Sequence, residues 1–125
     1  MGGERGSALA AALVMLVAVA ALAEAKEYNV TWSLPAIPPL LDVTKDDTVN
    51  FVFDATDLDL VKVPDKSSFD ACNGTGAQVL QSKTSAAPTV PVRLNQGLNT
   101  GHNYFICDIA NICSEGNTMI TINVN

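Results

Sequence analysis

Two cysteines near the carboxyl end of the chain stand in a pattern that could bind a metal or form a crosslink. In "YFICDIANICSEGN", residues 104–117, a strand-like apolar run reaches Cys107, five residues follow, and Cys113 then precedes a glycine-containing turn. A thiolate can ligate a metal ion, and two thiols can oxidise to a disulfide. A third cysteine, Cys72, lies upstream. The pattern therefore predicts a metal loop, a disulfide, or one of each.

The first 25 residues predict a secretory signal peptide. After the lone basic residue Arg5, every position from Ala8 to Ala23 is apolar, and an Ala-x-Ala cleavage site ends at Ala25. An uncleaved membrane anchor is the alternative, but an apolar run of 16 residues is shorter than the roughly 20 that span a bilayer. Cleavage leaves residues 26–125 as one small domain without a membrane span.

The charge of the mature domain excludes some partners. Without Glu4, Glu24 and Arg5, the 13 acidic and 7 basic residues of the chain fall to 11 and 6, a net charge of about −5. This charge argues against nucleic acid or an anionic membrane surface as partner. It also suits solubility.

Secretion determines how the cysteines and two asparagines are interpreted. In an oxidising compartment two of the three cysteines should pair, which leaves one over. The sequons "NVT" at Asn29 and "NGT" at Asn73 are predicted N-glycosylation sites. Asn73 directly follows Cys72 in a loop-like "CNGTG", so it should be the more accessible of the two.

The mature chain shows the alternation of short β-strands. Period-two runs and one extended segment predict strands at residues 27–33, 40–43, 48–53, 58–63, 89–94, 103–107 and 119–124. This number of short strands in about 100 residues predicts an antiparallel Greek-key sandwich. Pro91 places its strand at an edge or a bulge. Residues 73–88 lack alternation and predict a loop, with a helical turn near residues 77–82.

The joint spacing of all three cysteines with two apolar strands resembles the phytocyanins, the plant-type secreted cupredoxins. It rests on "SFDACN" at residues 68–73, followed about 30 residues later by "YFIC" and a cysteine six positions beyond Cys107. The resemblance covers residues 27–124. It implies an all-β, cupredoxin-like Greek-key β-sandwich of about seven or eight strands with one disulfide, between Cys72 and Cys113.

The family's copper site implies four ligand positions in this chain. A type 1 site uses two imidazoles and a thiolate in a plane, with a weak axial ligand. The resemblance carries these positions to Leu58, Cys107, Ile112 and Asn117, and a longer final strand would shift the axial position to Thr118. Only Cys107 retains a ligand residue, so no metal is expected.

Other residues are poor substitutes for the missing ligands. His102 is the only histidine, and it lies five residues before Cys107, at the opposite end of the predicted strand. Met119 is expected in the core. With Leu58 and Ile112 around it, Cys107 is expected to be a buried, inert thiol, and the alternatives are a redox-sensitive thiol or an intermolecular crosslink.

Replacement of two imidazoles by aliphatic side chains has two possible outcomes. Leu58 and Ile112 would either extend an apolar contact surface or fill the former metal site as a sealed plug. The acidic residues near predicted turns and strand ends are expected to be solvated; they are Asp42, Asp46, Asp47, Asp54, Asp57 and Asp59.

Two functions remain after enzyme chemistry is set aside for lack of a phosphate loop or a catalytic triad. The preferred one is a copper-free extracellular glycoprotein, similar to the early nodulin-like branch, with a structural role or one in binding an extracellular protein or glycan. The alternative is the blue-copper electron carrier that the family implies, with copper as cofactor. Because the chain stops after its last predicted strand, the mature protein is expected to be secreted or at the cell wall or surface, without a lipid tether.

Overall fold

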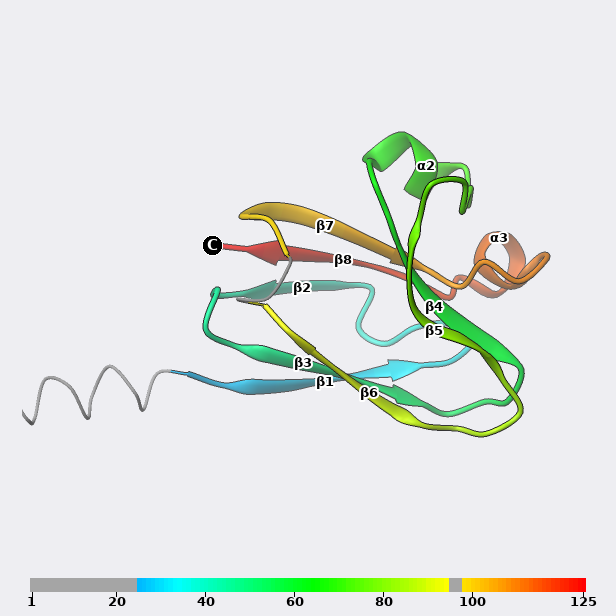
Figure 1. Cartoon of the computed structure of the whole chain (residues 1–125), viewed down its shortest axis with the longest axis horizontal. Helices are drawn as coiled ribbons and strands as arrows, with labels where there is room; N and C mark the ends of the chain where they lie inside the picture. Colours follow the sequence, from blue (N-terminus) through cyan, green and yellow to red (C-terminus); the bar gives the residue numbers. More distant parts are fainter. Residues whose placement is uncertain (1–24, 95–97) are drawn as a thin grey trace, which may run out of the picture.

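The computed structural model describes residues 25–94 and 98–125 and places them in two packed β-sheets (Figure 1). The predicted signal peptide, residues 1–25, lies outside the described residues except for Ala25. The elements are β1 (Glu27–Trp32), β2 (Leu40–Val43), β3 (Thr48–Phe53), β4 (Leu58–Val63), α2 (Lys66–Asp70), β5 (Gln78–Thr84), β6 (Thr89–Arg93), β7 (Gly101–Ile106), α3 (Ile112–Gly116) and β8 (Met119–Val124). No helix in these two ranges is long and apolar enough to cross a membrane.

The strand order confirms the predicted sandwich and corrects its pairing. One sheet has the order β1-β3-β6 and the other has the order β2-β8-β7-β4-β5. The prediction of an antiparallel sandwich is wrong for two pairs, because β1 pairs with β3 and β2 pairs with β8 in parallel. The chain leaves β1 for the second sheet through β2 and then returns, so β1 and β3 run in the same direction side by side.

Strand β5 occupies the middle of residues 73–88, where the sequence predicted a loop with a helical turn, so that prediction is wrong for residues 78–84. It is an edge strand that pairs with β4. Most of its side chains are exposed or half-buried on both faces, so its sequence has no reason to alternate. The edge position predicted for Pro91 is confirmed, since β6 pairs only with β3 in its sheet.

The core lies between the sheets and is built from the alternating residues of each strand. Trp32, Phe51 and Phe105 are buried in it, and adjacent ring centroids are 5.3 Å apart. The Trp32 indole nitrogen donates a hydrogen bond to the Asp59 backbone oxygen at 2.8 Å, which connects β1 of one sheet to β4 of the other. The aromatic core therefore supports the end of the sandwich where the candidate site begins.

Candidate metal centre

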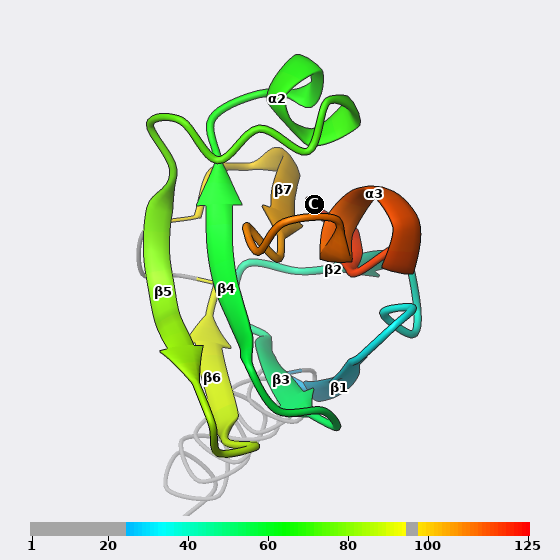
Figure 2. The same cartoon turned by 90° about the vertical axis from the view of Figure 1, so that its right-hand side faces the viewer.

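The loop from Cys107 to Thr118 closes one end of the sandwich. Strands β7 and β8 pair up to Ile106 and Met119, and the Cys107 backbone nitrogen then donates to the Thr118 backbone oxygen at 3.0 Å. Helix α3 lies within this loop and comes forward in Figure 2. The paired strands thus fix both ends of the loop in which the family's ligands would lie.

Leu58 and Ile112, the residues to which the resemblance carries the imidazole positions, are both apolar. Leu58 is the first residue of β4 and is 2% exposed, and Cys107 is fully buried in the same core cluster. Ile112 is half-buried and packs against that cluster. Of the two possible outcomes, this packing supports the sealed plug. The exposed large aliphatic side chains of the described residues are Leu34, Ile37, Leu40 and Val79, of which Leu34 lies beside Gly116 of α3.

The two candidate axial residues, Asn117 and Thr118, differ in burial. Asn117 is exposed and ends α3 in a left-handed conformation, with φ of 55°. Thr118 is fully buried, and its hydroxyl donates to the Ser33 backbone oxygen at 2.8 Å. That hydrogen bond ties the loop to the segment after β1.

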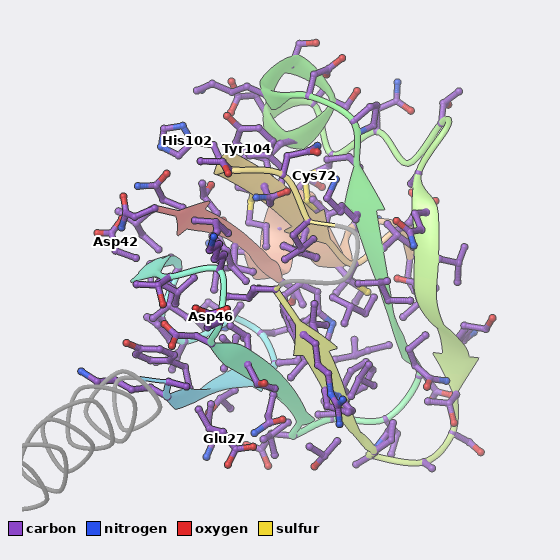
Figure 3. All side chains as sticks on the ribbon, turned by 60° about the vertical axis from the view of Figure 1, so that its left-hand side comes forward. Glu27, Asp42, Asp46, Cys72, His102 and Tyr104 are labelled. Carbon is purple, nitrogen blue, oxygen red and sulfur yellow. A yellow bond between two sulfur atoms is a disulfide. The ribbon has the colours of Figure 1, made fainter. Side chains whose placement is uncertain are left out.

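His102 lies at the opposite end of β7 from Cys107. It is exposed, and its ring is 6.3 Å from that of Tyr104 (Figure 3). His102 and Cys107 are five positions apart along the strand, a span of about 16 Å. Among the described residues, no group of three or more His, Cys, Asp or Glu side chains could hold a metal ion.

Asp59 connects β4 to the start of the loop, a contact that the sequence did not predict. Its Oδ1 accepts a hydrogen bond from the Asp108 backbone nitrogen at 2.6 Å. Burial raises the pKa of Asp59, against the lowering effect of this hydrogen bond. The expectation of a solvated turn residue is therefore wrong for Asp59, which lies within β4. It is also wrong for Asp47, which is 2% exposed.

The Cys107 thiol is in an environment that opposes its ionisation. Burial raises the pKa of Cys107 to about 11, although the backbone N–H groups of Asp59 and Ile109 act in the lowering direction. A protonated thiol without an imidazole beside it does not match the donor set of type 1 copper. The residues at the four family positions therefore do not fit the metal.

The disulfide lies beside this end, on the outer face of the five-stranded sheet. Cys72 and Cys113 are bonded, as the resemblance implied, and they join the segment after α2 to α3. They pack with Val61, Val63 and Ile106 in a second apolar cluster. Met119 is half-buried against the same cluster and not in the main core.

The predicted glycosylation sites lie on different local structures. Asn29 is exposed on β1, and its side-chain oxygen accepts a hydrogen bond from the Asn50 side chain at 3.2 Å. Asn73 is exposed in the turn after α2, where its side-chain oxygen accepts from the Thr75 backbone nitrogen at 3.0 Å. Both side chains thus lie at the surface.

An apolar groove lies along the outer edge of the five-stranded sheet. It has a volume of about 550 Å³, and its lining includes Ile37, Leu40, Phe69 and Met119. Ile37 and Leu40 are 58% and 57% exposed. Ile37 and Leu40 therefore expose apolar surface at the edge of the sheet, whereas Leu58 is buried.

Comparison with known proteins identifies the fold and the family. A family model for the plastocyanin-like domain matches residues 44–117. Spinach plantacyanin is 23% identical, with 79% of this chain and 99% of that chain covered and a TM-score of 0.58. Cucumber stellacyanin with Cu²⁺ is 23% identical, with 78% and 96% covered and a TM-score of 0.54.

A third solved structure, cucumber basic protein, is a blue copper protein. It is 22% identical, with 67% of this chain and 77% of that chain covered and a TM-score of 0.51. No curated protein sequence matches the chain. The family match spans more than half of the chain, and the solved structures share its architecture. The chain therefore belongs to the plastocyanin-like domain family, and its fold is the cupredoxin fold of the phytocyanins.

Proposed function

We propose that this protein is a secreted, copper-free phytocyanin-like glycoprotein, similar in character to the early nodulin-like branch. It acts outside the cell, in the wall or at the surface, by binding a protein or glycan or by a structural role, and it is not an enzyme. The proposal rests on the two positions to which the resemblance carries the imidazoles. They hold Leu58, which is buried in the same apolar cluster as Cys107, and Ile112, which packs against that cluster.

The exposed groove supports a protein partner for this role. Apolar side chains that are exposed together commonly mark contact surfaces. Ile37 and Leu40 are exposed at the groove, while Leu58 is sealed inside. A contact surface at the sheet edge needs no metal, which separates this role from electron transfer.

The alternative function is blue-copper electron transfer, and the comparisons are what favour it. Cucumber basic protein is a blue copper protein, and this chain shares its fold. Against it stands the lack of an imidazole at either position, with the chain's only histidine exposed at the other end of β7. Without the two imidazoles of the trigonal plane, only the thiol of Cys107 remains, and a single thiol is a poor copper site.

A restored ligand set tests whether Leu58 and Ile112 are what prevents copper binding. We expect the double variant Leu58→His/Ile112→His to bind one copper ion and to show the visible thiolate-to-copper absorption. The matched control adds Cys107→Ser to this variant and should lose the absorption. If the double variant folds but stays colourless with copper, the assignment of these positions is wrong.

A further inference from the structure

Asp47 binds the Lys26 backbone nitrogen, which would become the amino terminus after removal of the predicted signal peptide. Its carboxylate is buried, with 2% of the residue exposed. Oδ1 accepts a hydrogen bond from the Lys26 backbone nitrogen at 2.9 Å, and Oδ2 accepts one from the Thr44 backbone nitrogen at 2.8 Å. The Ala-x-Ala pattern independently places the cleaved bond between Ala25 and Lys26. The nitrogen that the predicted cleavage would release is therefore the same Lys26 nitrogen that donates to Asp47.

Backbone hydrogen bonds hold both groups in place. The Thr48 backbone nitrogen donates to the Lys26 oxygen at 2.9 Å, next to the parallel pairing of β1 with β3. On the other side, the Asp47 nitrogen donates to the Thr44 oxygen at 3.1 Å, and the Leu94 nitrogen donates to the Asp47 oxygen at 3.2 Å. Because Thr48 directly follows Asp47, these bonds hold the carboxylate and the Lys26 nitrogen next to each other at the start of β3.

The Asp47 carboxylate is ionised, and the other acidic side chains near it also favour the binding of a cation. Burial opposes its ionisation, but hydrogen bonds from Thr44 and Lys26 hold the pKa of Asp47 below its usual value, with a smaller contribution from the Lys26 charge. The surrounding hollow is also lined by Glu27, Asp46 and Arg93. Figure 3 shows Glu27 and Asp46 on the same side of the molecule. The carboxylates near the Lys26 nitrogen outnumber the basic side chains.

We propose that cleavage of the Ala25–Lys26 bond creates an amino-terminal ammonium that Asp47 binds as a partly buried ion pair, so that processing stabilises the mature fold. In the hydrolysis, water supplies a hydroxyl to the Ala25 carbonyl carbon and a proton to the Lys26 nitrogen. The freed amine then takes up one more proton from solvent near neutral pH. Charge-assisted hydrogen bonds of this kind are roughly twice as strong as neutral ones.

This device goes beyond the proposed binding role, because it involves neither a partner nor a metal. Its failure would therefore leave the copper question open, and a copper-binding result would leave the device untouched. It assigns a specific role to a buried aspartate that otherwise receives only peptide N–H groups in the hydrogen bonds of the unprocessed chain.

Two forms of the domain test the ion pair by urea denaturation with the disulfide intact. One begins at Lys26 with a free amine, and the other begins with an Nα-acetylated Ala25, so that the Lys26 nitrogen stays a peptide nitrogen. At about pH 6 the free form should have the higher midpoint and about a tenfold larger folding equilibrium constant. Binding to Asp47 raises the pKa of the ammonium in the folded state. The advantage should therefore be complete below the unfolded value of about 8 and should disappear as the pH rises through the folded value.

Two substitutions at adjacent acids provide the controls. Asp47→Asn keeps an acceptor oxygen but removes the charge, so the two forms should become equally stable. Asp46→Asn removes an exposed neighbouring charge and should preserve the difference. Equal midpoints of the two wild-type forms at pH about 6 would overturn the proposal, as would a gap that does not close at high pH.

Amino-terminal sequencing of the protein secreted by a eukaryotic cell tests the processing step directly. Lys26 as the first residue supports the proposal. A different first residue overturns it, whatever the stability measurements show.

Discussion

At the scale of single residues, Cys107 keeps the residue type of a copper thiolate in surroundings that make it unreactive. Burial raises the pKa of Cys107 to about 11. We therefore expect no reaction of the native protein with dithionitrobenzoate at about pH 8 and reaction of one thiol per chain in denaturant. Reaction of the native thiol, or chains linked through Cys107 on a non-reducing gel, would contradict this prediction.

The same thiol gives the fold a defined pH dependence. Its pKa is raised in the folded state, so the stability that the neutral thiol contributes is complete below the ordinary thiol pKa of 9.0. It is lost as the pH rises from there through about 11. The alkaline loss should be smaller in Cys107→Ala, which has no proton to lose.

Asp59 is predicted to destabilise the fold when it is ionised. Burial raises the pKa of Asp59, so its contribution to stability is complete below the unfolded value and is lost as the pH rises through the folded value. Asp59→Asn keeps an acceptor for the Asp108 N–H and removes the charge. We expect it to raise the melting temperature at neutral pH, where about 4 to 8 °C corresponds to 1 kcal/mol in a domain of this size.

Two comparisons control this effect. The gain from Asp59→Asn should shrink as the pH falls through the raised pKa of the wild-type carboxyl and should be absent below about 4, the ordinary aspartate value. Asp54→Asn, at an exposed acid, should change the melting temperature little. A lower melting temperature for Asp59→Asn at neutral pH would show that the charged form of the hydrogen bond to Asp108 stabilises the loop.

The sequence was sufficient to predict apolar surroundings for Cys107 but not the hydrogen bonds that hold the loop. The resemblance to a known family pointed to Leu58 and Ile112. Leu58 is buried in the same apolar cluster as Cys107, and Ile112 packs against that cluster. The hydrogen bond between Asp59 and Asp108 joins residues 49 positions apart. A carboxylate in such a contact has the same local sequence as a solvated one, so only the tertiary structure reveals it.

At the scale of elements, the disulfide fastens two short helical segments to the outer face of the five-stranded sheet. Cys72 follows α2, Cys113 lies in α3, and the bond closes a loop of 41 residues. Loss of this crosslink should lower the free energy of unfolding by about 4 kcal/mol in the chain-entropy model.

The double variant Cys72→Ala/Cys113→Ala measures this contribution by urea denaturation. We expect a large drop in the midpoint, with Cys107 still buried as long as the domain folds. Reduction of the wild type in its native state should give a similar drop. An unchanged midpoint in both cases would mean that α2 and α3 are held by packing alone.

Strands that bury one face were predictable from the sequence. Elements that bury little surface, such as β5 and α2, were not. Strand β3 alternates along its full length, with Val49, Phe51 and Phe53 buried, and its predicted bounds match. Strand β5 is an edge strand with little buried surface, so its apolar residues do not alternate with polar ones. Helix α2 is five residues long and has no buried residue, and its one local signal is the Asp65 side chain, which caps the Ser68 backbone nitrogen.

At the scale of the whole molecule, the chain keeps the cupredoxin architecture while its metal end is filled with core side chains. Strands β7 and β8 are paired, as needed to position a thiolate and an imidazole for one metal ion. The disulfide is also present. The fold alone therefore does not indicate electron transfer. The identity of the side chains at the loop decides between the two functions.

The most direct test of this account is a copper titration of the purified domain beginning at Lys26, followed by metal analysis and visible absorption. We expect no stoichiometric copper and no intense thiolate-to-copper band, while the Leu58→His/Ile112→His variant serves as the positive control. One tightly bound copper per wild-type chain with that band would contradict the account, and would mean that another group reaches Cys107.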